Sequence, residues 1–370
     1  MASIEKRPNG QWRARWREYP GGPQRARRFL RKVDAERWLT KVQHDLLTGS
    51  YVAPEASRTT VDDFYRLWFA RMAPTWRAST AGSVRNNFEK HLLPKIGGRP
   101  LTSLRRADIE ALYATLPVAP GTVAVVAQHL GQMLRSAVED GVLVRNPAYR
   151  ARLPRKEASK AQPVPLEVAE RIADALPEWM RVVVPLGVGA GLRQGEVSGL
   201  TVDRIHFLRR TLLVDRQLVN RHVPEPVLAP PKSDSSHRTI PLAQFVVEAL
   251  SVHLARFPRG DEELLVTTPG GSPLDSDRFG FQWRRATRAA GAPGLRFHAL
   301  RHTFASTLLS RGVSVKAVAD WLGHASPVIT LSTYAHLMPA DEEVARSVLD
   351  AALAPAAEDR LRTEAGSHTR

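Results

Sequence analysis

Short segments in which apolar and polar residues alternate open the chain, and each of them ends at a turn-forming sequence. The alternating segments are Ser3–Arg7, Gln11–Glu18 and Gln24–Leu30. Asn9-Gly10 and Gly21-Gly22 separate them, and such pairs supply the positive φ that hairpin turns need. We therefore predict a three-stranded sheet, followed by a helix capped near Asp34. Helical spacing puts the apolar residues of that helix on one face, namely Ala35, Trp38, Leu39 and Val42.

From residue 58 to residue 153 the apolar residues recur at helical spacing, which predicts an all-helical unit. Thr60 can cap a first helix that has Asp62 and Asp63 in its first turn. The apolar face of this helix carries Val61, Phe64, Leu67 and Trp68. Further helices are expected at Ala78–Leu92, Arg106–Leu116 and Thr122–Asp140, with breaks at the proline-containing stretches 94–100 and 117–120.

The remaining pattern completes a multidomain fold class that is mainly α with small β parts. Residues 155–162 are polar and basic and lie between two prolines, which is typical of a linker. Beyond them, helices alternate with a strand-rich patch at Thr211–Pro241, which predicts a mixed α/β domain. The predicted units are 1–50, 58–153 and 163–354, and the tail 355–370 has few apolar residues and is expected to be mobile.

Charge narrows the function classes. The chain has 53 Lys and Arg against 37 Asp and Glu, a formal charge of +16, and a pI near 10.7. This excess favours a polyanionic partner such as nucleic acid, and a generally basic, solvated surface is the alternative. There is no cysteine, which excludes disulfides and thiolate metal sites. The absence of a long apolar stretch and of a secretory signal predicts an intracellular protein without a membrane partner.

The basic residues gather in two candidate DNA-binding regions. Residues 1–50 carry 12 Lys and Arg against 5 Asp and Glu. Arg13, Arg15 and Arg17 alternate along one strand and project from one face, while Trp12 and Trp16 project from the other. A basic sheet of this kind suits insertion into a DNA groove, and a solvated face is the alternative. In the helical unit, Lys90, Lys95 and Arg105 lie near one connection, where they either hold phosphates or merely decorate helix ends.

The usual catalytic motifs for nucleotide, serine or metal chemistry are missing. The sequence has no Gly-rich loop ending in Gly-Lys-Ser/Thr, no Gly-x-Ser-x-Gly and no His-Glu-x-x-His. No carboxylate cluster suggests a two-metal nuclease. A basic DNA-binding protein of this composition would carry out phosphoryl chemistry with its own cationic side chains, or none at all, and we predict no metal and no cofactor.

Four segments contain groups suited to such chemistry. Gly191 can end one helix so that Arg193 begins the next, with Glu196 placed to brace its guanidinium. Lys232 follows Pro231 in a polar turn and would lie on a flexible hairpin. The third segment begins a helix in which His298 and Arg301 share a face and Leu300, Phe304 and Leu308 form the buried stripe. The fourth contains His324 and, ten residues later, Tyr334.

Singly, each of these residues has an ordinary structural explanation, but their order resembles that of the tyrosine recombinase, or phage-type integrase, family. That family carries Arg, Lys, His-x-x-Arg, His or Trp, and then Tyr. The matching residues here are Arg193, Lys232, His298, Arg301, His324 and Tyr334. The surrounding Gly-Leu-Arg-x-Gly-Glu, Leu-Arg-His-Thr-Phe-Ala and Leu-Gly-His-Ala-Ser sequences match as well. Ala299 and Val202 depart from the pattern, because many relatives have Asp and Trp there.

The resemblance implies a DNA strand exchange that proceeds through a covalent bond to Tyr334. The tyrosine would form a 3′-phosphotyrosine and release a 5′-hydroxyl, so that rejoining needs no ATP. Arg193 and Arg301 can fork onto the non-bridging oxygens. His298 and His324 would bond the phosphate, and either of them could help move the tyrosine proton. Lys232 is the candidate to protonate the leaving oxygen. A cationic pocket that favours phenolate is expected, because a Tyr hydroxyl has a pKa near ~10.

The resemblance also implies partners and leaves alternatives. It extends over the helical unit as a core-site-binding domain and over the N-terminal sheet as an arm-site-binding module. It implies double-stranded DNA, a homotetramer on paired sites, and accessory DNA-bending and excisionase proteins in a bacterial cytoplasm. An amphipathic helix at Asp341–Ala352 docks either on a neighbouring protomer or on its own domain. The alternatives are a type IB topoisomerase that only relaxes DNA and a catalytically silent DNA-binding protein derived from a recombinase.

Overall fold

A computed structural model describes residues 2–49, 51, 53, 58–155, 162–219, 225–231, 233–257, 263–337, 346, 347, 349 and 350. The chain divides into two compact units, Met1–Ala158 and Ser159–Arg370. Several expectations fall outside the described residues. These are most of the linker expected at 155–162, Lys232, most of the helix expected at Asp341–Ala352, and the tail from residue 355.

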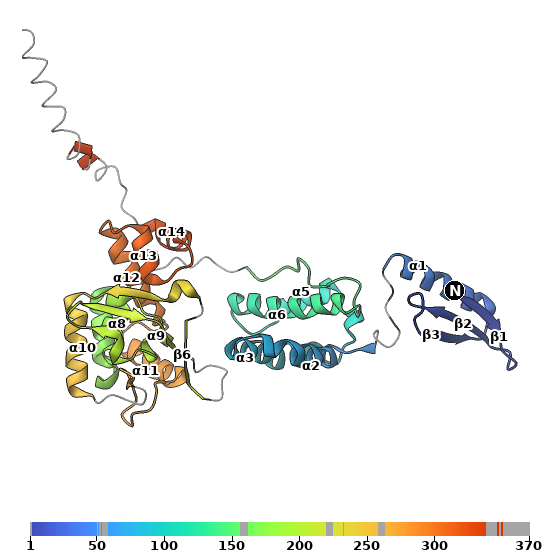
Figure 1. The fold of residues 1–370 in the computed structure, drawn as a ribbon, viewed down its shortest axis with the longest axis horizontal. Coiled ribbons are helices and arrows are strands. Elements are labelled where there is room, and N and C mark those ends of the chain that lie inside the picture. The colour runs from blue at the N-terminus through green and yellow to red at the C-terminus, as the bar shows by residue number, and fades with distance from the viewer. Residues whose placement is uncertain are drawn as a thin grey trace, which may run out of the picture. The chain divides into compact units, whose positions relative to one another are not determined.

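The N-terminal sheet forms as the alternation predicts. Strands β1 (Ser3–Lys6), β2 (Trp12–Arg17) and β3 (Gln24–Phe29) pair antiparallel in that order (Figure 1). Gly10 and Gly21 have φ of 80° and 79°, as the two hairpin turns require. One face of β2 buries Ala14 and Trp16 against helix α1 (Lys32–Leu47), whose Ala35, Leu39 and Val42 complete a small core.

Helix α1 begins earlier than predicted. The residue before its first turn is Arg31, and Asp34 lies inside that turn rather than at the cap. The carboxylate of Asp34 accepts hydrogen bonds of 2.9 and 3.0 Å from the guanidinium of Arg31. A carboxylate three residues into a helix is favourable near the positive end of the helix dipole, which explains why Asp34 marks this region without being the cap itself.

The rest of the first unit is a helical body. It comprises α2 (Val61–Met72), α3 (Ala78–Asn87), α4 (Leu93–Ile96), α5 (Arg106–Ala114) and α6 (Pro120–Glu139), with short 3-10 segments at Ala73–Thr75 and Leu101–Ser103. Thr60 caps α2 as predicted: its hydroxyl accepts from the backbone N–H of Asp63, whose carboxylate accepts from the backbone N–H of Thr60. The apolar faces meet in one core around Trp68, Phe88, Leu130 and Met133.

The break expected over residues 94–100 begins later than Pro94, because the helical path continues to Ile96. A π-helical turn, η3 (Phe88–Leu92), joins α3 to α4, and Pro94 lies at the start of α4. Proline has no amide N–H to donate, so it is tolerated in the first turn of a helix, and the wider π turn connects the two segments. The path ends at Gly97, where α2 and α4 are linked by a hydrogen bond from Asp62 N to Gly97 O.

The second unit combines helices with two small sheets. Its elements in order are α7 (Leu166–Ala175), η5 (Glu178–Met180), α8 (Val183–Ala190), α9 (Gln194–Ser198), η6 (Val202–Arg204), β4 (Ile205–His206), β5 (Thr211–Val214), β6 (Gln217–Val219), β7 (Val227–Ala229), η7 (Asp234–Ser236), β8 (Arg238–Pro241), α10 (Gln244–Arg256), α11 (Ser276–Ala289), α12 (His298–Ser310), α13 (Val315–Leu322), α14 (Pro327–Tyr334) and η9 (Ala335–Leu337). The sheets are antiparallel with orders β4-β5-β8 and β6-β7, so the predicted strand-rich patch is confirmed.

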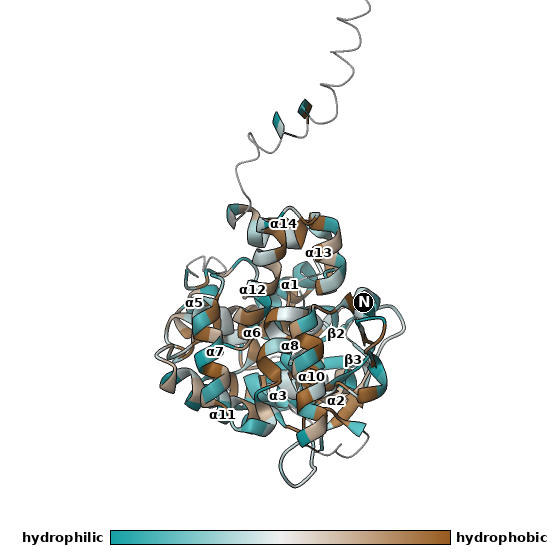
Figure 2. Cartoon of the chain, turned by 90° about the vertical axis from the view of Figure 1, so that its left-hand side faces the viewer, coloured by the Kyte–Doolittle hydropathy of each residue, from teal (hydrophilic) through white to brown (hydrophobic). Residues whose placement is uncertain are grey.

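Helix α12 is central to this unit. It packs on α8 and on α13, and α13 in turn packs on α14 (Figure 1). Helices such as α10 and α11 carry both hydrophobic and hydrophilic residues, as expected where one face enters a core and the other meets water (Figure 2). The buried stripe of α12 runs through Leu300, Phe304 and Leu309, whereas the predicted Leu308 is only partly buried. Ala299 and Val202, the two departures from the family pattern, also pack partly buried against this core.

Candidate active site

Arg193 is placed by a tight connection between two helices. Helix α8 ends at Ala190, and Gly191 follows with a φ of 61°. A Cβ at Gly191 would approach the Phe304 ring to 2.6 Å, so only glycine fits both this backbone and this packing. Arg193 is then the N-terminal cap of α9, and its backbone N–H donates to Glu196 Oε2 at 2.8 Å. Its guanidinium donates to Glu196 Oε1 at 2.8 Å, which confirms the predicted brace.

Glu196 holds a second arginine that the sequence reasoning missed. The guanidinium of Arg238 donates to both Glu196 oxygens, at 2.9 and 2.7 Å, and both side chains are 4% exposed. Burial by itself would raise the pKa of Glu196, but the hydrogen bonds and charge of Arg238, together with the charge of Arg193, lower that pKa to about 2. The alternation of β8 could have pointed to Arg238, because this strand buries every second residue and Arg238 shares its buried face with Ile240. In the sheet, Arg238 lies opposite Val214 of β5.

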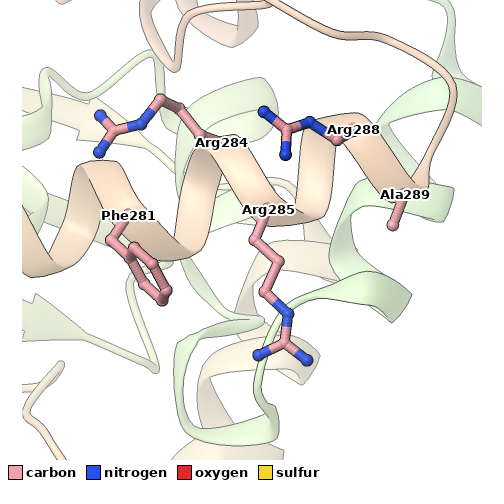
Figure 3. Close-up of a pocket in the computed structure, with 5 residues that line it drawn as sticks. All are labelled: Phe281, Arg284, Arg285, Arg288 and Ala289. Atoms are coloured by element: carbon pink, nitrogen blue, oxygen red, sulfur yellow. The ribbon is translucent and has the colours of Figure 1, made fainter.

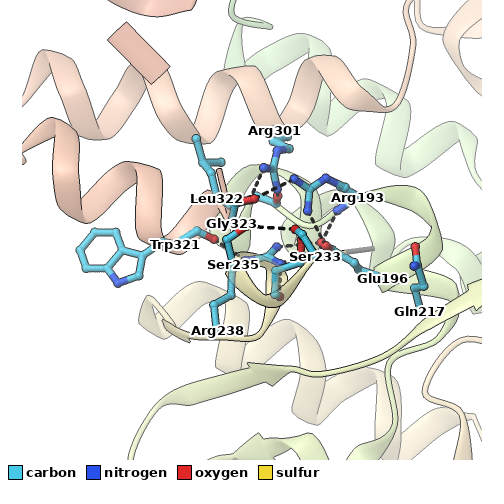
Figure 4. A network of polar contacts seen from close by, with 12 residues as sticks. Arg193, Glu196, Gln217, Ser233, Ser235, Arg238, Arg301, Trp321, Leu322 and Gly323 are labelled. Atoms are coloured by element: carbon cyan, nitrogen blue, oxygen red, sulfur yellow. Dashed lines mark hydrogen bonds and ion pairs between the residues drawn. The ribbon is translucent and has the colours of Figure 1, made fainter. Parts of the chain in front are cut away.

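Three arginines bind three consecutive carbonyls at the C-terminal end of α13 (Figure 4). Arg238 Nε donates to Trp321 O at 2.6 Å, Arg301 Nη2 donates to Leu322 O, and Arg193 Nη2 donates to Gly323 O at 3.2 Å. The last carbonyls of a helix lack partners within it and carry its negative dipole end, so guanidinium groups are favourable there. This helix end therefore gathers Arg193 and Arg301, which lie more than a hundred residues apart in the chain.

The same helix end places His324. Gly323 has a φ of 63°, and the chain then enters the turn before α14. His324 Nδ1 lies 2.7 Å from Thr330 Oγ1 of α14. Burial, followed by the charges of Arg301 and Arg193, lowers the pKa of His324 to about 4, so its ring is neutral at pH 7.

Arg301 is buried to 1% exposure and fixed at both ends of its guanidinium. In addition to the Leu322 carbonyl, it donates from Nη1 to Gly191 O at 2.7 Å. Burial and the charge of Arg193 lower the pKa of Arg301 to about 9, which leaves it cationic at neutral pH. His298, one helical turn before it, has its pKa lowered to about 4, first by burial and then by His302 and Arg301. Of the two residues predicted on this helix, Arg301 is therefore cationic and His298 is neutral at pH 7.

Tyr334 ends helix α14 and is 1% exposed. Its hydroxyl lies 2.7 Å from Nδ1 of His302, a residue to which the sequence reasoning gave no role. Burial raises the pKa of Tyr334 to about 12, and the charge of Arg301 only partly opposes this effect. The expected pocket that favours phenolate is therefore wrong for the protein without DNA, because desolvation of the hydroxyl outweighs the nearby positive charge.

Two of the predicted DNA-binding arginines are already paired. Arg13 and Arg15 project on the same side of β2, and both reach Glu5 of β1, at 3.4 and 2.7 Å. Arg17 donates from Nη1 to Gly22 O in the second hairpin turn. Lys90, Lys95 and Arg105 are exposed, with Arg105 directly before α5.

An exposed basic surface that the sequence reasoning did not identify lies on α11. Arg284 and Arg288 project from one side of this helix, and Arg285 projects from the other side with Phe281, which is 58% exposed (Figure 3). Together with Ala289 these residues line a pocket. The opposite face of the helix buries Phe279, Trp283 and Ala286 in the core. We refer to Arg284, Arg285 and Arg288 as the α11 arginine surface. Clustered exposed arginines are the electrostatic footprint of a phosphate-binding face.

Replacing the α11 arginine surface by glutamine is expected to weaken DNA binding at low salt and to flatten its salt dependence. Each lost phosphate contact reduces the slope of log K against log salt by about 0.9. Fluorescence anisotropy with a labelled duplex across a salt series measures both quantities. Arg209→Gln, at an exposed position of the same unit, is the matched control. An unchanged slope in the triple variant would exclude this surface from the DNA interface.

The part of the chain that the structure describes contains no group of metal-ligating residues and no helix long and apolar enough to cross a membrane. The phage integrase family matches residues 164–341, and the phage integrase central domain matches residues 61–153. The chain belongs to the phage integrase family.

Relatives and solved structures agree with this family membership. The chain is 26% identical over 318 residues to a tyrosine recombinase XerC-like protein of Caldanaerobacter subterraneus subsp. tengcongensis, which covers 76% of this chain and 80% of that one. It is 24% identical over 351 residues to the integrase of Mycobacterium phage D29, covering 88% and 90%.

Two of the solved structures that share the fold of this phage integrase illustrate the similarity. One is the Tn1549 transposon integrase in complex with a circular intermediate DNA, with a TM-score of 0.66 and 20% identity over 79% of this chain and 98% of that chain. The other is a lambda integrase tetramer bound to a Holliday junction, with a TM-score of 0.54 and 18% identity over 90% and 94%.

Proposed function

We propose that this phage integrase is a site-specific DNA recombinase that cleaves and rejoins DNA through a 3′-phosphotyrosine at Tyr334. The observation that carries the proposal is the convergence of Arg193 and Arg301 on the end of α13, beside His324 and with Tyr334 on the next helix. Metal-independent phosphoryl transfer needs cationic groups of this kind near a nucleophile, which supports the proposal.

The chemistry of each group follows from its surroundings. Arg193 is 36% exposed, so its guanidinium can meet a phosphate while Glu196 and Gly323 O fix its plane. Arg301 adds a second positive charge, held in place by the carbonyls of Gly191 and Leu322. Together they neutralise the negative charge that grows on the non-bridging oxygens in the transition state. His298 and His324 are neutral and can share hydrogen bonds with the same phosphate.

Strand transfer then conserves the energy of the phosphodiester bond in the bond to tyrosine. The Tyr334 oxygen attacks phosphorus, the 5′-oxygen leaves as a hydroxyl with a proton from Lys232, and a 5′-hydroxyl from a partner duplex reverses the step. Two such exchanges through a four-way junction complete recombination. This reaction integrates, and in reverse excises, a phage or mobile element.

The expected partners follow from the proposed reaction. They are double-stranded core sites, which the helical body and the second unit would bind, and arm sites, which the sheet at residues 1–50 would bind. A homotetramer would assemble on paired sites, with a DNA-bending protein and an excisionase as accessory factors, in the cytoplasm of a bacterial host.

In a gel-shift titration, the double variant Arg13→Gln with Arg15→Gln should weaken binding to arm-site DNA and leave core-site affinity unchanged. Equal losses at both sites would contradict the assignment of the sheet to arm sites.

A nicked suicide duplex tests the enzyme assignment directly. Wild-type protein is expected to remain covalently attached to DNA, which denaturing gels detect as a shifted band, without metal or ATP. Failure to form any adduct on cognate sites would leave only a DNA-binding protein. If the adduct forms but two duplexes that carry cognate sites never exchange strands, the protein acts as a type IB topoisomerase, and relaxation of supercoiled plasmid would then be the activity observed.

A further inference from the structure

The hydroxyl of Tyr334 has a defined partner for its proton. Among the described residues, His302 Nδ1 at 2.7 Å is the group that shares a hydrogen bond with it, and the two rings meet at 60° with centroids 5.6 Å apart. Because Tyr334 is 1% exposed, bulk water does not reach this hydroxyl. The proton that a tyrosine must lose to attack phosphorus therefore needs a protein group to accept it.

Among the described residues, neither of the two histidines expected to do this is hydrogen-bonded to the Tyr334 hydroxyl. His324 Nδ1 is bonded to Thr330 Oγ1, and the His298 ring meets the ring of His302 at 85° and 4.8 Å. His302 lies next to Arg301 and one turn after His298, so the same helix that presents the phosphate-binding groups also presents the partner of the nucleophile.

His302 is in the form that can accept a proton. Burial and the adjacent charge of Arg301 lower the pKa of His302, so its ring is neutral at pH 7. With its hydrogen on Nε2, the ring offers a lone pair on Nδ1 to the phenolic O–H. A nucleophile and a base within about 2.6–3.2 Å form the usual arrangement of an activated hydroxyl.

We propose that His302 is a further catalytic residue, the base that takes the proton of Tyr334 in cleavage and returns it in religation. This assignment rests on the proposed function. In cleavage the Oη–H bond breaks and the proton passes to Nδ1, the Oη–P bond forms, and the P–O5′ bond breaks. The 5′-oxygen receives a separate proton from Lys232. In religation the 5′-hydroxyl loses its proton to Lys232 and attacks phosphorus, while His302 protonates the departing Tyr334 oxygen.

Two substitutions separate proton transfer from positioning. In His302→Asn the amide oxygen lies near the position of Nδ1, so it accepts the same hydrogen bond, but it is not basic. His302→Ala removes both functions. The rate of adduct formation on a nicked suicide duplex is measured for each variant, alongside DNA affinity as a check that the site is folded. Both variants are expected to lose about 100-fold or more in rate with unchanged affinity, since general base catalysis contributes about 10²–10⁴-fold.

A substrate with sulfur in place of the bridging 5′-oxygen locates the defect. A thiolate leaves without a proton, so this duplex should restore Lys232→Ala and leave the His302 variants slow. The proposal would be overturned if His302→Asn cleaved at the wild-type rate, or if His302→Ala cleaved faster than wild-type protein. It would also be overturned if the sulfur substrate restored the rate of both His302 variants. If wild-type protein itself forms no adduct, the proposed function fails instead, so the two failures are distinguishable.

Discussion

Tyr334→Phe is expected to bind DNA with the affinity of the wild type and to form no covalent adduct with it. The substitution removes the single oxygen that would attack phosphorus and keeps the ring, which is 1% exposed at the end of α14. The phosphate-binding groups do not depend on this hydroxyl, because Arg193 and Arg301 are held by Glu196 and by backbone carbonyls. Loss of a covalent nucleophile costs on the order of 10⁶ in rate in a well-studied hydrolase, so no adduct should be detectable.

The suicide-duplex assay and an anisotropy titration, run side by side, measure the two quantities. Tyr113→Phe is the matched control, because Tyr113 is also a buried tyrosine, 2% exposed, and belongs to the core of the helical body. That variant should cleave normally. An adduct formed by Tyr334→Phe would show that another residue is the nucleophile.

Glu196→Gln is expected to lower both the stability of the second unit and the rate of cleavage. Glu196 is 4% exposed and forms ion pairs with two guanidinium groups, those of Arg193 and Arg238. Removing the charge of one partner in a buried pair leaves the other uncompensated, which costs about 3–5 kcal/mol of unfolding free energy. Cleavage should fall as well, because the plane of the Arg193 guanidinium is set by Glu196 Oε1.

Thermal denaturation and the suicide-duplex assay measure these effects, and a double-mutant cycle assigns the cause. Arg238→Met alone, Glu196→Gln alone and the double variant are compared. Because the two residues are in direct contact, the double variant should lose less than the sum of the single losses. Strict additivity would mean that the two side chains stabilise the unit independently.

The pH dependence of stability follows from the same carboxylate. The pKa of Glu196 is about 2 in the folded protein, lowered from its ordinary value of 4.5. Its contribution to stability is therefore complete above about pH 4.5 and is lost as the pH falls toward 2, because the unfolded chain binds the proton first. Glu196→Gln should have a flatter stability profile in this window, and an unchanged profile would contradict the assignment.

Much of the local structure was predictable from the sequence because it depends on neighbouring residues. The strands at the N-terminus, the Thr60 capping box and the left-handed Gly191 follow from turn chemistry and spacing of a few residues. Local prediction failed at two places. Asp34 was taken as the helix cap although it lies within the first turn of α1. At Pro94 the helical path was expected to break, but a π turn carries it past this residue.

The candidate site was only partly predictable. The ordered set from Arg193 to Tyr334 was recognisable by resemblance, and the Glu196 brace by its three-residue spacing. Arg238 and His302 were missed, because each acquires its significance from a partner that is distant in the chain: Glu196 is 42 positions from Arg238, and Tyr334 is 32 from His302. The spacing of residues along the sequence does not indicate contacts between such distant positions.

By itself, the sequence determined the family, the order of the candidate catalytic residues and the basic character that suits a DNA partner. The tertiary structure decided which carbonyls the arginines bind, that Tyr334 is buried with a pKa raised to about 12, and that His302 is the residue in contact with its hydroxyl. The reason is physical. Residue types and local spacing are properties of the chain, whereas desolvation and hydrogen-bond partners exist only once α8, α12, α13 and α14 have packed around the site.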